Sequence, residues 1–123
     1  MANEIAIKWL AYPEDHDYPA AESYLSLLYD ELAAARYVEQ LRKAPVSKFK
    51  AKDIFRASGL PLVGISNSHV EHDREKVVAG QSLSPLLLVR VTNGEKVIIA
   101  DGYHRMCAVY SFDEDALVPC KIV

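Results

Sequence analysis

The spacing of apolar residues predicts one long helix near the start of the chain. Between residues 20 and about 43, apolar side chains recur three or four positions apart, and no glycine or proline interrupts them. These side chains share one helical face: Leu25, Leu28, Leu32, Ala35, Val38 and Leu41. Pro19 suits the first turn of this helix, Arg42 and Lys43 suit its last turn, and Pro45 ends it.

Short apolar runs in the second half of the chain predict strands. Four runs are bounded by residues that are typical of turns, and they cover residues 62–65, 85–91, 97–100 and 117–123. The Asn-Gly pair within residues 92–95 favours a tight hairpin turn between the second and third runs. Pro119 indicates that the last strand lies at a sheet edge, or that the proline lies where its missing N–H does no harm.

Shorter segments connect these elements. The pattern predicts a helical turn over residues 53–57, a short helix over residues 73–79 and a further helix over residues 103–110. Residues 46–52 hold three lysines and Phe49. We interpret them as a solvated linker anchored by the phenylalanine, with contact to a phosphate backbone as the alternative.

Together these elements predict a single α/β (α+β) domain over residues 1–123, in which helices pack a small mixed sheet. Residues 1–60 would be a helical N-terminal extension, and residues 61–123 the core. The composition is that of an ordinary globular chain, with 50% hydrophobic and 25% charged residues. A net charge of −3 and a pI near 5.8 disfavour duplex DNA as a partner.

Three further features of the sequence bear on the cell compartment in which the protein works. No apolar run approaches the roughly 20 residues that cross a bilayer, so we expect no membrane partner. The first residues are too short and too mixed in charge for a signal peptide, which predicts a cytoplasmic protein. Cys107 and Cys120 fit two buried, reduced thiols, with a disulfide or redox pair as the alternative.

The junction within residues 97–109 is the strongest candidate site. An apolar strand stops at Asp101-Gly102, and a helix with basic residues at its start follows. The first N–H groups of such a helix can hold a phosphate or a carboxylate. The planar guanidinium of Arg105 could bind a phosphate through two hydrogen bonds. His104 could donate a hydrogen bond or carry a proton, and Asp101 could contact a metal ion or a ribose. The structural alternative is that Asp101 caps the helix while Arg105 pairs with a surface acid.

A second candidate is the titratable cluster in residues 69–73. His69 and His72, with Glu71 or Asp73, have a spacing that could bind a divalent metal, but an exposed helix start explains the cluster more simply. Glu71 qualifies as a general base only if folding carries it to the junction. The sequence holds no P-loop, no dinucleotide fingerprint and no Cys-x-x-Cys pair.

The order of elements over residues 68–123 resembles the ParB/sulfiredoxin-like superfamily. In that superfamily a strand ends in a Gly-x-x-Arg box that opens a helix, and an Ile-Pro-x-x-Val-like strand follows. Here the box is Gly102-Tyr103-His104-Arg105, and the strand is residues 118–123. Members include CTP-binding partition proteins, sulfiredoxin and free-serine kinases, and the resemblance implies that the box is a phosphate cradle for a nucleotide.

Departures from the family patterns narrow this resemblance. Tyr103 stands where sulfiredoxin has its reactive cysteine, which argues against sulfinic-acid reduction. The chain also lacks the acid-Arg-Arg sequence of the partition proteins and room for their other domains. The Asp-Gly-x-His-Arg form is most similar to the free-serine kinases, and Glu71 is then the positional match to their catalytic glutamate.

The resemblance therefore implies a nucleotide- or phosphate-binding domain, and a small-molecule phosphotransferase as its catalytic version. Glu71 and His104 would be catalytic, and the ligand would be held by Asp101, Gly102, Tyr103, His104 and Arg105. ATP, ADP or CTP would be the nucleotide, with Mg²⁺ shared between the phosphates and Asp101. Two alternatives stay open: a non-catalytic module that forms homodimers through the tyrosine-bearing N-terminal helix, and a DNA-associated or nuclease-like protein.

Overall fold

The computed structural model describes residues 6–62, 64, 66–91 and 96–123. In these ranges the elements are α1 (Asp17–Leu28), α2 (Glu31–Lys43), β1 (Val46–Lys50), α3 (Ala51–Ser58), α4 (Ser68–Val78), β2 (Leu86–Val91), β3 (Lys96–Asp101), α5 (Tyr103–Phe112) and β4 (Leu117–Ile122). The strands form one sheet in the order β1-β4-β2-β3. The β1–β4 and β2–β3 pairs are antiparallel and the β2–β4 pair is parallel, so the predicted small mixed sheet is confirmed.

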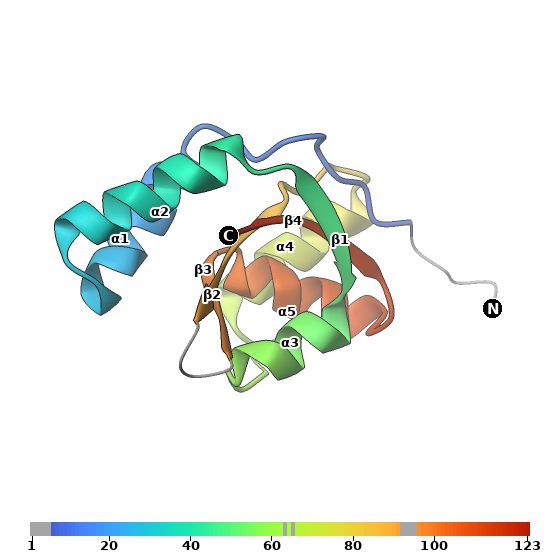
Figure 1. The fold of residues 1–123 in the computed structure, drawn as a ribbon. Helices are drawn as coiled ribbons and strands as arrows, with labels where there is room; N and C mark the ends of the chain where they lie inside the picture. Colours follow the sequence, from blue (N-terminus) through green and yellow to red (C-terminus); the bar gives the residue numbers. More distant parts are fainter. Residues whose placement is uncertain (1–5, 63, 65, 92–95) are drawn as a thin grey trace.

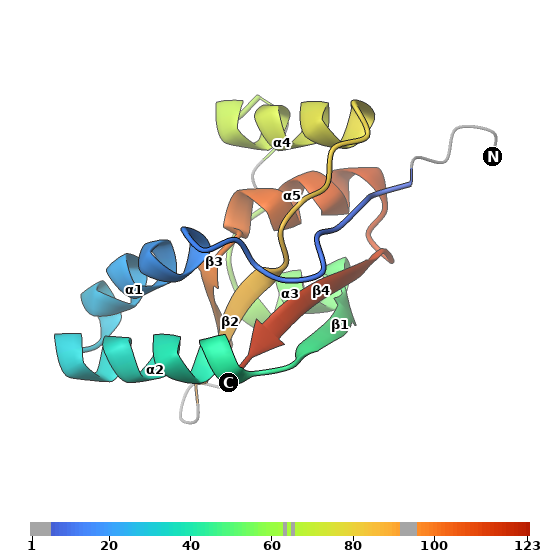
Figure 2. The same cartoon turned by 90° about the horizontal axis from the view of Figure 1, so that it is seen from above.

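Helices cover both faces of the sheet (Figures 1 and 2). The hairpin of α1 and α2 packs on one face, where Leu87 and Val89 of β2 join its core. Helices α3, α4 and α5 pack on the other face, around Leu86 and Leu88. Successive side chains of a strand point to opposite faces, so the continuous apolar run in β2 supplies both cores.

The prediction of one long N-terminal helix is wrong, because the chain turns back at Tyr29 and Asp30. Tyr29 has an extended backbone, and the side chain of Asp30 accepts a hydrogen bond of 2.8 Å from the N–H of Ala33, which starts α2. A helix over the whole predicted range would be about 36 Å long and would leave much of its apolar face unburied. The hairpin lets both halves pack on the sheet.

The predicted linker at residues 46–52 is also not a linker. Its first five residues form the edge strand β1, which pairs with β4 from Val46↔Lys121 to Lys50↔Leu117. The lysines of β1 can lie at a solvated edge, as edge strands commonly carry them. The sheet therefore includes a strand from the predicted N-terminal extension.

Three other predictions, on Pro119, on residues 62–65 and on the Asn-Gly turn, have different outcomes. Strand β4 is an interior strand, but its pairing with β2 starts only at Cys120, so Pro119 breaks no bond on that side. Of the predicted strand at residues 62–65, Leu62 and Gly64 belong to no strand, and the other two residues lie outside the described residues. The Asn-Gly turn also lies outside them, although β2 and β3 do pair as a hairpin.

Helix α4 begins earlier than its sequence pattern predicts. The side chain of Asn67 accepts hydrogen bonds from the N–H groups of His69 and Val70, so the helix starts at Ser68 and takes in the whole titratable cluster. The helices predicted over residues 53–57 and 103–110 are confirmed as α3 and α5, each slightly longer.

The two cysteines are buried and form no disulfide, as expected. Burial raises the pKa of Cys120 to about 12, which keeps this thiol protonated and unreactive. Among the described residues, no helix has both the length and the apolar character needed to span a membrane.

Candidate functional site

The turn between β3 and α5 depends on Gly102. Its φ of 108° lies in the left-handed region that L-residues with a side chain rarely adopt. A Cβ atom at this position would lie 2.7 Å from Cγ of Leu86 and 2.9 Å from Nη2 of Arg105. Glycine therefore lets the chain turn sharply and brings the start of α5 against Leu86 of β2.

The first N–H groups of α5 are not capped by a side chain. The N–H of Met106 donates to the carbonyl oxygen of Gly102 at 2.9 Å, and no side-chain hydrogen bond caps the turn before it. The helix dipole adds partial positive charge at this end. The alternative that Asp101 caps the helix is wrong, since its carboxylate binds Arg105.

Arg105 is held inside the molecule by two acceptors. Its Nη2 atom lies 3.0 Å from Oδ2 of Asp101 and 3.3 Å from the carbonyl oxygen of Pro85. The side chains of Arg105 and Asp101 are only 16% and 17% exposed. The Nε atom of Arg105 is buried and has no hydrogen-bond partner among the described residues. A buried guanidinium donor without an acceptor is costly, so it calls for an explanation.

Asp17, which no sequence pattern indicated, lies beside Asp101 of this ion pair. It lies at the start of α1, is buried, and accepts a hydrogen bond of 2.9 Å from the N–H of Glu14. Burial raises the pKa of Asp101; Arg105 opposes this shift, and the neighbouring carboxyl of Asp17 adds to it. Two carboxyl groups thus lie side by side, and Arg105 binds one of them. In the sequence, Asp17 is only one of three acids in a proline-bounded segment, and nothing there relates it to Asp101.

His104 links the box to the titratable cluster on α4. Its ring lies 4.8 Å from the ring of His69 and 5.3 Å from the ring of Tyr103, between centroids. Burial lowers the pKa of His104, the neighbouring His69 lowers it further, and Asp73 opposes both. The imidazole is therefore neutral near pH 7, when it has one N–H donor and one acceptor nitrogen. The hydroxyl of Tyr103 donates to the carbonyl oxygen of Pro61.

Glu71 lies on a different face of α4 from His69. It is exposed on α4 and lines an open hollow with Arg74, Glu75, Val78 and Ala79. Residues two apart on a helix project about 200° apart, so the face that brings His69 to His104 carries Glu71 elsewhere. The described residues hold no group of three His, Cys, Asp or Glu side chains that could bind a metal ion.

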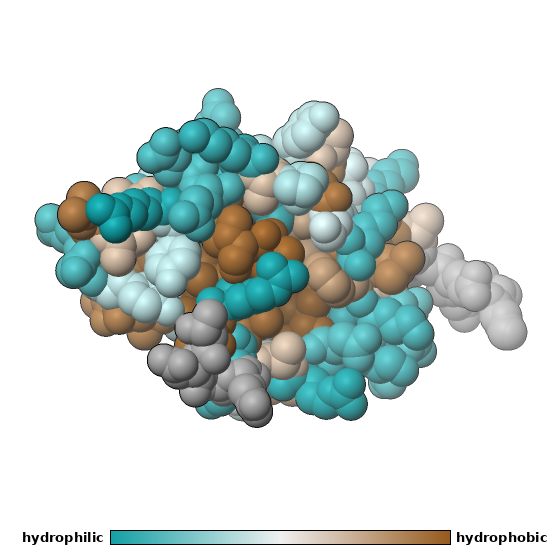
Figure 3. Space-filling model, viewed as in Figure 1, coloured by the Kyte–Doolittle hydropathy of each residue, from teal (hydrophilic) through white to brown (hydrophobic). Residues whose placement is uncertain are grey.

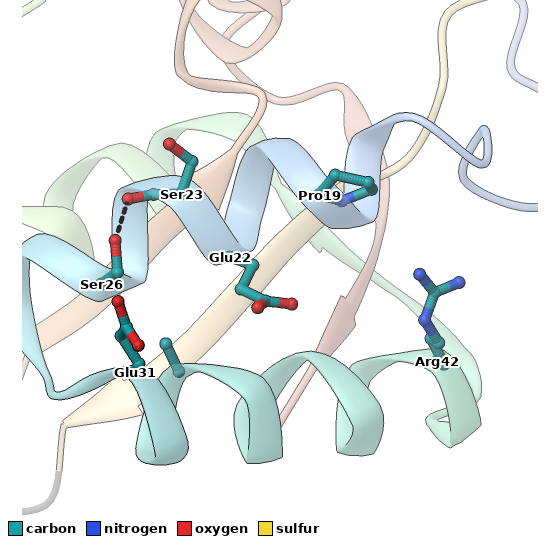
Figure 4. A pocket seen from close by; sticks show the side chains of 7 residues that line it. Pro19, Glu22, Ser23, Ser26, Glu31 and Arg42 are labelled. Carbon is teal, nitrogen blue, oxygen red and sulfur yellow. Dashed lines mark hydrogen bonds between the residues drawn. The ribbon is translucent and has the colours of Figure 1, made fainter.

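A larger hollow lies between α1 and α2, away from the box (Figure 4). It measures about 430 Å³ and is lined by Pro19, Glu22, Ser23, Ser26, Glu31, Ala34 and Arg42. Arg42 stacks on the ring of Tyr18, with 4.4 Å from its Cζ atom to the ring centroid. The two glutamates make this open groove a poor place for a phosphate.

Comparisons of the chain with family models, with curated proteins and with solved structures found no match.

Proposed function

We propose that this protein binds the phosphate group of a nucleotide at the start of α5. The proposal rests on one observation above all: uncapped N–H groups and a buried, partnerless Arg105 Nε meet at a glycine turn. Helix starts and guanidinium groups are the common phosphate donors in proteins, and here they lie on adjacent residues. The resemblance of the box to the ParB/sulfiredoxin-like superfamily supports ATP, ADP or CTP as the ligand.

The ion pair between Asp101 and Arg105 is then the resting state of the site. A phosphate brings more negative charge than a carboxylate and offers three acceptor oxygens, so it competes well for the guanidinium. The raised pKa of Asp101 lowers the cost of this exchange, since its carboxyl can take up a proton beside Asp17 when Arg105 leaves. Neutral His104 would add a donor next to the bound phosphate.

The proposal is for binding, and it includes no transfer step. A phosphotransferase needs a base near the acceptor, and the predicted base Glu71 lines a hollow on another side of α4. Mg²⁺ fits poorly as a protein-held ion, because the Asp101 oxygen that would face it is bonded to Arg105 at 3.0 Å. Any Mg²⁺ would arrive on the nucleotide phosphates.

Isothermal titration with ATP, ADP and CTP, each with Mg²⁺, tests the proposal. We expect the wild type to bind at least one of them and Arg105→Ala to weaken that binding by roughly tenfold or more. Arg56→Ala is the matched control, because Arg56 is an exposed arginine on α3 that forms an ion pair with Asp53, one turn away. Circular dichroism checks that both variants are folded. Absence of binding by the wild type, or equal binding by Arg105→Ala, would remove the proposal.

A further inference from the structure

Strand β3 lies at one edge of the sheet, and the hydrogen bonds of its neighbour show which way its backbone points. In β2, the N–H of Arg90 donates to the carbonyl oxygen of Val123, and the N–H of Val123 donates to that of Leu88. These bonds show that the backbone N–H and C=O groups of Leu88 and Arg90 point toward β4. Because backbone groups alternate along a strand, Val89 between them faces β3.

The outward-facing backbone groups of β3 follow from this alternation. Val89 is paired with Ile98, so the N–H and C=O groups of Ile98 point toward β2. The N–H and C=O groups of Val97 and Ile99 then point away from the sheet. No backbone hydrogen bond in the described chain reaches them from that side. Such an unpaired edge is a template for another strand.

Helix α1 places exposed apolar side chains beside this edge. It packs on β3 through Leu25, which shares a core with Ile98. Tyr24, Leu27 and Leu28 are 41%, 81% and 50% exposed, and they lie on the side of α1 that faces away from the groove with α2. The hairpin projects past the sheet on the side of β3 (Figures 1 and 2), and apolar surface is visible at that end in Figure 3.

The other face of the edge carries two more exposed apolar side chains, Leu60 and Leu62. Leu60 lies between Gly59 and Pro61, which contact the chain near the two ends of β3, and Leu62 follows Pro61. A Cβ atom on Gly59 would be 3.3 Å from the side chain of Lys96, and the carbonyl oxygen of Pro61 accepts from Tyr103. Five of the ten large apolar side chains that are exposed in the described residues therefore flank this edge.

We propose that a second copy of this chain pairs with β3, antiparallel and with the two-fold axis at Ile98. Val97 of each copy would exchange its two backbone hydrogen bonds with Ile99 of the other, which joins the two sheets into one. Helix α1 lies over the same axis, so its exposed apolar stripe, Tyr24, Leu27 and Leu28, would meet its symmetry mate. This assignment is independent of phosphate binding.

Two observations favour a second copy over an unrelated extended peptide. Lys96 is exposed at one end of β3, so antiparallel pairing keeps the two copies of this lysine apart, whereas parallel pairing would place them side by side. A peptide would satisfy the strand edge but leave the apolar stripe of α1 exposed, whereas a second copy covers both. The six-residue strand and twelve-residue helix make a small interface. We therefore expect a dimer that dissociates on dilution.

Sedimentation velocity over a wide range of protein concentrations tests the dimer. We expect reversible dimerisation by the wild type, and a dissociation constant raised roughly tenfold or more by Leu27→Glu, which would bury an unpaired carboxylate at the axis. Val78→Glu on α4 is the matched control, since Val78 is 67% exposed and outside the surface. A wild type that stays monomeric overturns the proposal. So does a dimer that Leu27→Glu leaves intact or that Val78→Glu weakens equally.

Hydrogen–deuterium exchange tests the strand pairing directly in the unmodified protein. We expect the amides of Val97 and Ile99 to exchange quickly in dilute protein and slowly at concentrations where the dimer forms. The amide of Ile98, which points toward β2, serves as the internal control because it is protected at both concentrations. Exchange at Val97 and Ile99 that does not depend on concentration would overturn the proposed β3 pairing.

Discussion

The starts of helices α2 and α5 are built in opposite ways. Helix α2 begins with Asp30, whose side chain caps a backbone N–H, and it carries an acid in the first turn and basic residues in the last. Helix α5 begins with Gly102, has no side-chain cap and no acid in its first turn, and places basic residues there. At α2, side chains of the helix itself cap a free N–H group and balance the helix dipole. At α5, the positive end of the dipole has no acidic side chain of the helix beside it.

This difference indicates where the molecule gives up stability. Uncapped N–H groups, a guanidinium donor without a partner among the described residues and a turn that requires glycine occur together at α5, while α2 has the features that stabilise a helix. Unfavourable features that gather at one place are typical of functional sites. Substitutions at the two helix starts test this contrast, and Gly102 should show the largest effect.

Gly102→Ala should be the most damaging substitution at either helix start. The new methyl group meets Leu86 at 2.7 Å and the backbone must keep a φ of 108°, so we expect a loss of about 3 kcal/mol in the free energy of unfolding. Urea denaturation measures it. Gly80→Ala is the control, because Gly80 also has a positive φ, 77°, but its nearest neighbour would be Lys8 Nζ at 3.8 Å. A loss no larger than the control's, about 1 kcal/mol, would contradict a close-packed turn.

Asp101→Asn should separate stability from ligand affinity. The variant keeps an acceptor but removes the charge beside Arg105, so we expect unfolding to become easier by about 2 kcal/mol. Phosphate or nucleotide affinity should rise by about three- to tenfold, because Arg105 is released from its internal partner. Titration calorimetry measures the affinity, with Asp115→Asn as the control at an exposed ion pair with Lys52. Weaker binding would show that Asp101 helps to hold the ligand.

Asp30→Ala should cost stability without changing ligand binding. It removes the hydrogen bond to the N–H of Ala33, and loss of such a cap costs about 1 kcal/mol. Thermal unfolding and titration of the same ligand provide the two measurements. Asn67→Ala, at the capped start of α4, should show a comparable loss of stability. If Asp30→Ala changed ligand affinity, the hairpin of α1 and α2 would influence binding at the box, which contradicts this prediction.

The smallest effect should be a dependence of stability on pH that comes from His104. Its pKa in the folded protein is lowered below its usual value of 6.5, mainly by burial. The unfolded chain therefore takes up the proton first, and stability should be full above about pH 6.5 and fall as the pH drops through the folded pKa. Urea denaturation at several pH values measures this slope. His104→Gln should flatten it, and an unchanged slope would assign the proton to another group.

Local patterns in the sequence predicted the elements near the box well. The run of β-branched residues, the single glycine and the following helical pattern predicted β3, the sharp turn and α5, because each depends on residues close together in the chain. The same reasoning failed for the long helix. Helical periodicity continues across Tyr29 and Asp30, and only packing of both halves on the sheet favours the turn.

Long-range partners were beyond the reach of the sequence. Residue type alone made Arg105 and His104 candidates for phosphate binding. It did not show that Asp101 would bind the guanidinium with Asp17 beside it, or that His69 would contact His104. Asp17 lies 84 residues before Asp101 in the chain, and no periodicity relates them. The predicted role of Glu71 depended on the same unknown, namely which face of α4 meets α5.

The amino-acid sequence thus determined the class of fold and the chemistry at the start of α5, since both follow from residue type and local spacing. Only the tertiary structure decided which strands lie at the sheet edges, that β3 is one of them, and that Arg105 is bound by Asp101 with Asp17 beside it. The physical reason is that these features arise from burial and pairing between distant segments. Their free energy depends on the whole packed arrangement, and local propensities do not contain it.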